Sequence, residues 1–350
     1  MLQYPIYLDH ASTTPVEQRV KFAMLPYFDE IYGNASSNHA YGEEPRLAIE
    51  NAREQVARII NATKKEIFFT SGATEAINWA LKGFLEANPE KGNHIITVKT
   101  EHKAVLNTCE YLERKGIEVT YLNVDENGLI SLDELKESIR DNTAIIAVMY
   151  VNNEIGVLQN IQAIGQVAKE NDVCFFCDAT QAIGKVPVDV VDKDIDLLCL
   201  SAHKMNGPKG VGALYIKSGI TLIPLVHGGS QEKGMRGGTY NTPLIVGFGE
   251  AARIAFDEFD ERVNQMLKQR DKWQAYFESQ GLGVVQFKNT IRAPHILSIQ
   301  VNIDAEDFLI MNAAKFSAST GSACNAALIE ESHVTKEVGL KKNMTIRISI

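Results

Sequence analysis

The chain has 350 residues, of which 45% are hydrophobic and 23% charged, so it can bury a large core and we expect a soluble, two-domain protein of enzyme size. The formal net charge of −9 disfavours a nucleic-acid-binding surface, and we expect no direct binding to nucleic acid. The first residues lack the charged and apolar regions of a signal peptide, and no apolar run approaches the ~18 residues of a membrane helix. We therefore expect a cytoplasmic protein that does not contact a membrane.

Short apolar runs typical of strands alternate with runs typical of helices through the first two thirds of the chain. The expected strands are 67–70, 95–98, 119–123, 144–150, 173–177, 197–200 and 211–216, and the expected helices are 74–86, 103–114, 132–139 and 161–170. This alternation predicts a mostly parallel sheet with helices on both faces. The ligand site of such a sheet lies beyond the carboxyl ends of its strands.

The pattern changes after about residue 245, where a charged helical tract over 247–279 precedes shorter strands such as 295–301. We predict a large domain of residues 16–245, and a smaller α+β domain built from residues 1–15 and 246–350. A glycine-dense segment, 228–238, is a loop with functional potential.

Two of the expected strands end on residues that suit a pyridoxal phosphate site. The run Leu-Cys-Leu-Ser-Ala-His-Lys places Lys204 after a buried strand, and the preceding strand ends on Asp178, followed by Thr180 and Gln181. A lysine amine can hold the cofactor aldehyde as a Schiff base, and a carboxylate can keep the pyridine nitrogen protonated. Lys204 and Asp178 therefore predict this cofactor at the sheet edge.

Residues 70–75, Thr-Ser-Gly-Ala-Thr-Glu, have the pattern of a strand end, a small-residue turn and a helix start. Backbone amides at such a helix N-terminus, with the Thr74 hydroxyl, can bind a phosphate group. An ordinary turn capped by serine or threonine has the same pattern. Ser201 and His203 strengthen the phosphate interpretation because they place two more donors just before Lys204.

Three further polar residues lie in or just after apolar strands. His102 can stack on a pyridine ring and transfer protons, although a histidine at a strand end also serves as a cap or faces solvent. Asn153 can bond a cofactor oxygen or a substrate carboxylate, and its alternative role is in an Asn-rich turn. Arg347 alternates with isoleucines, and it is either a bidentate partner for a substrate carboxylate or an ordinary surface arginine.

The five cysteines fall into two groups. Cys324 stands among small residues in 319–326, where a flexible, accessible loop would suit a nucleophilic thiol, although an incidental loop cysteine is the alternative. The other four lie in apolar strands or a helix and are expected to be buried, namely Cys109, Cys174, Cys177 and Cys199. The Cys174 and Cys177 pair does not favour metal binding, because residues three apart on a strand face opposite sides. We expect no metal site.

Taken jointly, these segments resemble the cysteine desulfurases of the NifS and IscS type, in the class V aminotransferase group of fold-type I pyridoxal phosphate enzymes. The resemblance covers nearly the whole chain and implies an α/β fold with a mostly parallel sheet of the seven-stranded type. The matching segments are 7–15, 33–42, 70–75, 100–103, 152–156, 178–181, 201–204, 207–210, 236–239 and 321–324.

The resemblance implies roles around the cofactor. Lys204 would carry pyridoxal phosphate, Asp178 would pair with its ring nitrogen, and Gln181 would bond its phenolic oxygen. His102 would stack on the ring and help to move protons. The phosphate would be bound by Ala73, Thr74, Ser201 and His203, and by Thr239 from the neighbouring subunit of a homodimer.

The resemblance also implies the reaction. Asn153, which can also contact the cofactor, and Arg347 would hold the carboxylate of L-cysteine. Cys324 would attack the substrate sulfur, so that L-alanine leaves and a persulfide remains on the enzyme. A sulfur-acceptor protein would then receive the sulfur for iron–sulfur cluster assembly or for nucleic-acid thiolation.

Two departures from the family pattern limit what the resemblance implies. Ala35 stands where relatives usually have proline, a change expected to loosen a turn without affecting the chemistry. The chain ends at Ile350 where relatives continue into a terminal helical segment, and this second departure bears on partner choice. We therefore expect a dedicated sulfur donor for a narrower pathway, such as nucleic-acid thiolation. The rival functions are a transaminase, a lyase acting on selenocysteine, and a non-catalytic scaffold. Cys324 argues against the transaminase, and the intact set of Lys204, Asp178, His102 and Cys324 argues against the scaffold.

Overall fold

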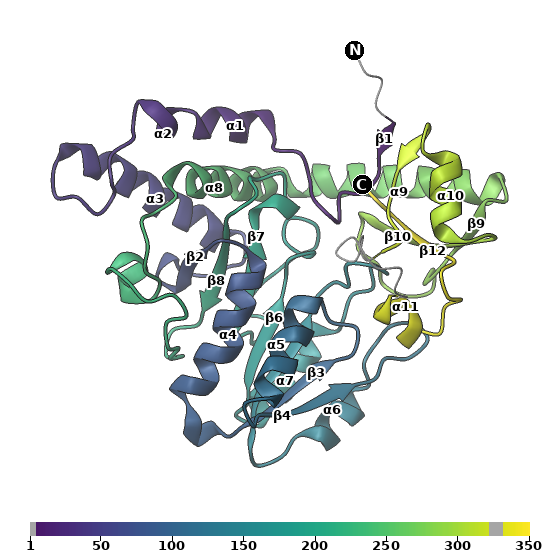
Figure 1. Ribbon diagram of the computed structural model, residues 1–350, viewed down its shortest axis with the longest axis horizontal. Coiled ribbons are helices and arrows are strands. Elements are labelled where there is room, and N and C mark those ends of the chain that lie inside the picture. The colour runs from purple at the N-terminus through teal and green to yellow at the C-terminus, as the bar shows by residue number, and fades with distance from the viewer. Residues whose placement is uncertain (1–4, 322–331) are drawn as a thin grey trace.

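A computed structural model of the chain describes residues 5–321 and 332–350 (Figure 1). Within them lies one large sheet with the strand order β2-β8-β7-β6-β5-β3-β4. Its strands are β2 (Ile67–Thr70), β3 (His94–Val98), β4 (Glu118–Leu122), β5 (Thr143–Met149), β6 (Cys174–Asp178), β7 (Leu197–Ser201) and β8 (Gly212–Ile216). Only β8 pairs antiparallel with its neighbours, β2 and β7, so the predicted mostly parallel sheet of seven strands is confirmed.

Helices cover both faces of this sheet because its strands are apolar on both sides (Figure 1). On β6, Phe175 and Cys177 belong to one core and Cys174 and Phe176 to the other, as the two-residue period of a strand requires. The first core includes residues of α1 (Gln18–Met24), α3 (Ala40–Arg58), α6 (Leu132–Ser138), α7 (Ile161–Glu170) and α8 (Thr242–Asp257). The second core includes residues of α4 (Ala73–Ala87) and α5 (Lys103–Glu113).

The helical tract expected over 247–279 consists of two helices, α8 and α9 (Phe259–Ser279), which meet at Glu258. Helix α8 begins at Thr242, and its buried side chains, such as Phe248, lie in the first core of the large sheet. The boundary expected between residues 245 and 246 therefore falls inside a helix, and the division into two domains stays a prediction.

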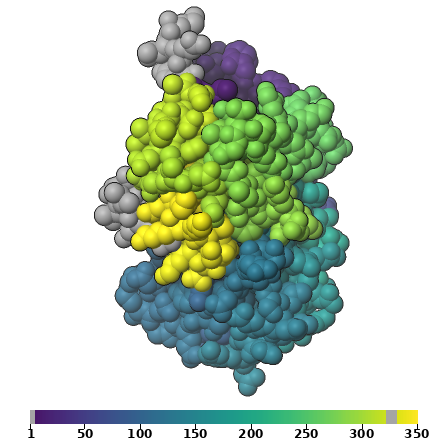
Figure 2. Space-filling model, turned by 90° about the vertical axis from the view of Figure 1, so that its right-hand side faces the viewer, coloured from purple at the N-terminus to yellow at the C-terminus, as the bar shows by residue number. Residues whose placement is uncertain are grey.

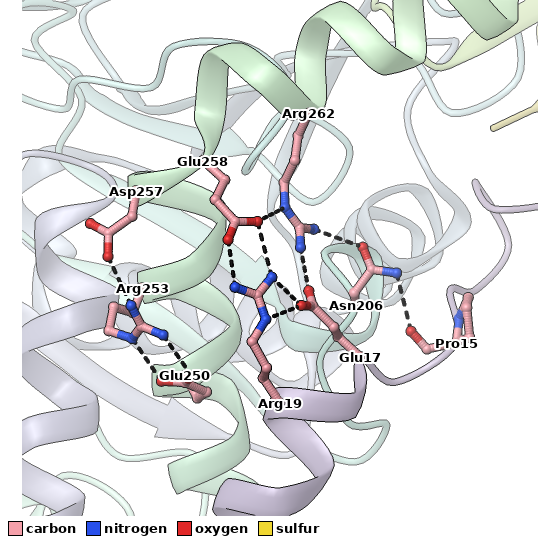
Figure 3. Close-up of polar contacts among 9 residues, drawn as sticks. All are labelled: Pro15, Glu17, Arg19, Asn206, Glu250, Arg253, Asp257, Glu258 and Arg262. Atoms are coloured by element: carbon pink, nitrogen blue, oxygen red, sulfur yellow. Dashed lines mark hydrogen bonds and ion pairs between the residues drawn. The ribbon is translucent and has the colours of Figure 1, made fainter.

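A charged network surrounds the junction of α8 and α9 (Figure 3). The Glu258 carboxylate accepts hydrogen bonds from Arg19 of α1 and from Arg262 of α9. Arg262 also pairs with Glu17 and donates to the Asn206 side chain at 3.4 Å. Single exposed ion pairs stabilise little, but this network connects the helix junction to the segment that follows Lys204.

The C-terminal part of the chain forms a second, smaller sheet with the order β12-β10-β9, in which both pairings are antiparallel. Its strands are β9 (Gly283–Val285), β10 (Ile296–Val301) and β12 (Thr345–Ser349), and the helices α10 (Ala305–Asn312) and α11 (His333–Glu337) lie between β10 and β12 in sequence. The N-terminal strand β1 (Ile6–Tyr7) pairs in parallel with β11 (Phe316–Ser317), and Asp9 forms an isolated bridge with Ser349 of β12, so the N-terminal segment joins this C-terminal part of the chain.

Figure 2 shows the C-terminal residues in yellow between the green helical part of the chain and the blue residues of the large sheet. His333 donates from Nε2 to the Glu101 carbonyl at 2.9 Å across this boundary. Among the helices of the described residues, none has the length and apolar character needed to span a bilayer.

Candidate active site

A cavity of about 550 Å³ lies beyond the carboxyl ends of β2, β5, β6 and β7, where an α/β sheet is expected to bind its ligand. The predicted site residues that line it are Ala73, Thr74, His102, Asn153, Asp178, Gln181, Ser201, His203, Lys204 and Arg347. Thr239 is exposed and does not line the cavity, and Cys324 lies outside the described residues.

Lys204 enters the cavity from a short 3₁₀ turn, η3 (Ala202–Lys204), directly after β7. Its Nζ donates to the carbonyls of Ala11 and Ser12, the second at 2.8 Å. These partners belong to the N-terminal segment, to which the sequence analysis assigned no role at the cofactor. The lysine is therefore held by a segment that lies almost 200 residues before it in the chain.

Asp178 is the last residue of β6, and its carboxylate is buried. The Oδ1 atom accepts from the Thr180 amide at 2.9 Å and from the Cys199 thiol at 3.2 Å. These two donors fix the direction of the carboxylate at the sheet edge. A fixed, buried carboxylate is the group that a protonated pyridine nitrogen requires.

His102 is the N-cap residue of α5, and its Nδ1 accepts from the Ala104 amide at 3.1 Å. The neutral ring therefore carries its proton on Nε2. Burial lowers the pKa of His102 below its ordinary value, which keeps the ring neutral near pH 7. A neutral imidazole at this edge can both stack on a ring and move a proton through Nε2.

Gln181 is oriented by a histidine that the sequence analysis missed. Its Nε2 donates to the Ala11 carbonyl at 2.8 Å, and its Oε1 accepts from Nε2 of His295 at 3.1 Å. His295 is fully buried just before β10, and its Nδ1 has no partner among the described residues. Sequence offers no signal for this contact, because it joins segments from the two sheets.

Burial lowers the pKa of His295 well below 6.5, and nearby cations, Lys185 first, lower it further. Below about pH 6.5 the unfolded chain binds a proton at this residue and the folded chain does not. We therefore predict that the free energy of unfolding decreases as the pH is lowered below about 6.5, and that this one group contributes a decrease of about 1.4 kcal/mol per pH unit.

Urea unfolding between about pH 7.5 and pH 5.5 measures this dependence. His295→Gln keeps a side-chain amide that can donate to Gln181 but cannot titrate, so its stability should fall less steeply with acid than that of the wild type. Equal slopes for the two proteins would contradict the prediction. Other buried histidines, such as His94, contribute equally to both slopes.

The N-terminus of α4 suits a phosphate group. Its N-cap is Gly72, and no side chain among the described residues caps the helix, so its first amides can bind an anion. Ser201 lies at the end of β7, and Nδ1 of His203 contacts the Thr13 hydroxyl at 3.1 Å. Burial and then the charge of Lys204 lower the pKa of His203 to about 4, so this ring is neutral at pH 7.

Arg347 in β12 is buried at the cavity wall. Nη1 donates to the carbonyls of Asn153 at 2.8 Å and Gly321 at 3.0 Å, and Nη2 donates to Asp9 and Ser12, each at 2.7 Å. The buried Nε has no partner among the described residues. An unpaired buried donor costs free energy, and a ligand carboxylate would satisfy it.

Glu154, a second residue that the sequence analysis did not single out, contacts both flanks of the 322–331 segment. Its Oε2 accepts from the Ser332 hydroxyl at 2.5 Å, and burial raises the pKa of its carboxyl group. Gly321 has a φ of +101°, and a Cβ there would lie 2.7 Å from the same oxygen. Glycine is therefore required at this point, beside the carboxylate.

The predicted burial of four cysteines is confirmed for Cys109, Cys174, Cys177 and Cys199. Burial raises the pKa of each thiol, so none is a reactive thiolate at neutral pH.

The cavity fits pyridoxal phosphate. It contains the Lys204 amine, the buried Asp178 carboxylate and the uncapped N-terminus of α4, and its volume suits the cofactor.

Comparison with known proteins supports this interpretation. The sequence profile of the family described as Aminotransferase class-V matches residues 6–350. The chain is 51% identical over 340 residues to a protein of Neisseria gonorrhoeae (strain ATCC 700825 / FA 1090) named Cysteine desulfurase IscS, with 96% of this chain and 84% of that protein covered. Two solved structures are similar to it. One is a NifS-like protein, with a TM-score of 0.91, 37% identity, and coverage of 99% of this chain and 93% of that one. The other is titled SspA in complex with cysteine, with a TM-score of 0.86, 38% identity, and coverage of 99% and 98%.

Proposed function

This chain belongs to the aminotransferase class-V family, and from that premise we infer that it is a pyridoxal phosphate-dependent cysteine desulfurase. The observation that carries the inference is the meeting of Lys204 and Asp178 at one cavity, beside the uncapped N-terminus of α4. The cysteine-bound neighbour supports L-cysteine as the substrate.

Several residues would hold the cofactor. Lys204 would attach it through Nζ, Asp178 would pair with its ring nitrogen, and Gln181 would contact its phenolic oxygen. Its phosphate would lie at the N-terminus of α4, beside Ala73, Thr74, Ser201 and His203. Bound there, pyridoxal phosphate supplies an electron sink for the charge that develops when a substrate proton is removed.

The chain's own side chains would bind the substrate and move its protons. The Nε–H of Arg347 and the Asn153 side chain would hold the L-cysteine carboxylate. The Lys204 amine would accept the substrate proton at Nζ, and His102 would transfer protons through Nε2. Both groups are partly buried in the cavity, which limits the access of competing water to the reacting atoms.

Cys324 would accept the sulfur. Its thiolate forms a bond to the substrate sulfur while the carbon–sulfur bond breaks, and the electron pair of that bond stays on the carbon. The carbon takes up a proton and leaves as L-alanine, so a persulfide remains on Cys324. A sulfur-acceptor protein then takes the outer sulfur, for iron–sulfur cluster assembly or nucleic-acid thiolation. The free state of the described cysteines supports a location of this enzyme in the cytoplasm, where thiols stay reduced.

A homodimer would complete the site. Large apolar side chains are exposed on α1, on α2 (Pro26–Asp29), next to α2 and on α3, and these helices lie on one side of the molecule (Figure 1). These side chains are Phe22, Leu25, Phe28, Tyr32, Tyr41 and Leu47. Exposed apolar side chains on neighbouring helices support a protein interface. Thr239, exposed and away from its own cavity, is available to the partner's phosphate site.

Product analysis tests the proposed function. Purified protein with bound cofactor, L-cysteine and a reductant is expected to form L-alanine and sulfide in equal amounts. Pyruvate and ammonia in place of alanine would indicate β-elimination, and a keto acid that retains sulfur would indicate a transaminase. Protein that binds no cofactor would favour the scaffold interpretation.

A further inference from the structure

Lys185 is a buried lysine that the reaction described above does not use. It is 5% exposed, and the described residues give it no carboxylate partner. Its Nζ donates to the backbone carbonyl of Lys204 at 2.6 Å. Lysine is rarely buried without an ion pair, because its charged form loses solvation there. The role of the buried Lys185 is therefore to be sought in its hydrogen bond to the backbone of Lys204.

The 3₁₀ turn that presents Lys204 has three carbonyls, and each one accepts a hydrogen bond. The Ala202 carbonyl accepts from the Met205 and Gly207 amides, both at 3.0 Å. The His203 carbonyl accepts from the Thr14 amide at 3.0 Å and from the Thr14 hydroxyl at 2.9 Å. The Lys204 carbonyl accepts from Lys185. Lys185 thus supplies the hydrogen bond that fixes the third carbonyl of the turn.

Lys185 comes from the segment that also carries the residues expected to contact the ring. Asp178 ends β6, Gln181 follows, and the chain turns at Gly184, which has a φ of +69°. A Cβ on Gly184 would lie 3.1 Å from the Cβ of Ala255 on α8, so the turn needs glycine to pack there. Lys185 therefore connects the segment after β6 directly to the segment after β7.

A second cavity, of about 490 Å³, lies on the other side of Lys204 and is also lined by Lys185 and His10. Burial, and then the charge of Lys204, lower the pKa of Lys185 to about 7. The neutral amine still has N–H groups to donate, so the hydrogen bond to Lys204 persists in both protonation states. The contact can operate throughout the neutral pH range.

We propose that Lys185 is a positioning residue for Lys204. Its hydrogen bond fixes the Lys204 carbonyl, and with it the direction in which the Lys204 side chain enters the cofactor cavity. This inference rests on the proposed function, because it assumes that Lys204 carries pyridoxal phosphate. The chemistry of Lys204 stays its own, and Lys185 acts only through the backbone of that residue.

Two variants test the role, with one control. Lys185→Met removes the donor with similar side-chain length, and Lys185→Gln keeps an N–H donor without the charge. Lys169→Met changes an exposed lysine of α7 and is the control. Protein freed of cofactor is mixed with pyridoxal phosphate, and the visible absorbance gives the rate of attachment to Lys204. Visible circular dichroism of the bound cofactor reports its orientation, and urea unfolding of the cofactor-free proteins reports stability.

Lys185→Met should slow attachment roughly 10-fold to 100-fold, the effect of losing one hydrogen bond to a charged donor, and should weaken the circular dichroism signal. Lys185→Gln should recover much of the attachment rate and of the circular dichroism signal, and Lys169→Met should match the wild type in both measurements. Unchanged attachment and dichroism in Lys185→Met would overturn the inference, as would equal defects in both Lys185 variants, which would indicate packing alone. If Lys185→Met does not fold, Lys185→Gln alone tests the proposal. This variant keeps an N–H donor, so a circular dichroism signal from its bound cofactor as weak as that of free cofactor would overturn the positioning role. Wild-type protein that attaches no cofactor would instead overturn the proposed function.

Discussion

Replacing Cys324 with serine is expected to lower L-alanine release from L-cysteine by at least about 10³-fold, because a serine hydroxyl cannot form the persulfide that takes the sulfur. Cofactor absorbance should be unchanged, since the substitution leaves Lys204 and Asp178, which would hold the cofactor, intact. The other thiols cannot substitute for it. Burial raises the pKa of Cys109 to about 12 and that of Cys174, Cys177 and Cys199 well above 9.

Cys174→Ala provides a matched control, because Cys174 is a buried thiol of β6 that packs in the second core. This variant should retain alanine release and should gain one sulfur atom per chain, detected by mass spectrometry after incubation with L-cysteine. Cys324→Ser should gain none. Full activity in Cys324→Ser would show that sulfur leaves without the thiol, and the function would then be that of a lyase.

Local sequence patterns predicted the sheet and the strand ends that carry the site. The strands could be predicted because both faces of the sheet are buried, as Phe175 in one core and Phe176 in the other show. Such strands appear in the sequence as short continuous apolar runs. Parallel strands bring their carboxyl ends to one edge, so the sequence alone was enough to place Asp178 and Lys204 together. Residue order along the strands was sufficient for this part of the site.

The contacts that orient those residues could not be predicted, because they join segments that are distant in sequence. Ala11 and Ser12 accept from Lys204, and His295 donates to Gln181, across the contact between the two sheets. Neither a backbone carbonyl nor a single buried histidine leaves a periodic pattern. The break between α8 and α9 could not be predicted for a similar reason, since glutamate is an ordinary helix former and the partner of Glu258 that is distant in sequence, Arg19, lies on α1.

Glu232→Ala is expected to lower the free energy of unfolding by about 3–5 kcal/mol, because it leaves Nη1 and Nη2 of the buried Arg53 without their carboxylate, while only Nε keeps the half-exposed Glu50 as a partner. Glu232 lies in the short 3₁₀ segment η4 (Gln231–Gly234) and is 3% exposed. Its carboxylate accepts from Nη1 and Nη2 of Arg53 at 2.7 and 2.8 Å, and from the Phe69 amide at 2.9 Å. Arg53 also donates to the Ile67 carbonyl, so the pair fastens the loop to β2.

Urea unfolding of the cofactor-free protein measures the loss, and Glu118→Ala is the matched control. Glu118 pairs with Arg140 at 2.7 Å, but both side chains are about half exposed, so this substitution should cost at most about 1 kcal/mol. Equal losses in the two variants would contradict the prediction. A double variant, Arg53→Met with Glu232→Ala, separates the cause. If the unpaired charge causes the loss, the double variant should be more stable than Glu232→Ala alone.

The same substitution should reach the active site through the loop that Glu232 anchors. Glu232 and Lys233 have left-handed φ values of +47° and +58°, a conformation that few residues adopt without support. Further along the loop, Arg236 pairs with Glu75 in the first turn of α4, and Thr239 follows. Glu232→Ala should therefore weaken cofactor retention as well as stability, and the double variant should restore stability more than retention, because it removes the buried charge without rebuilding the anchor.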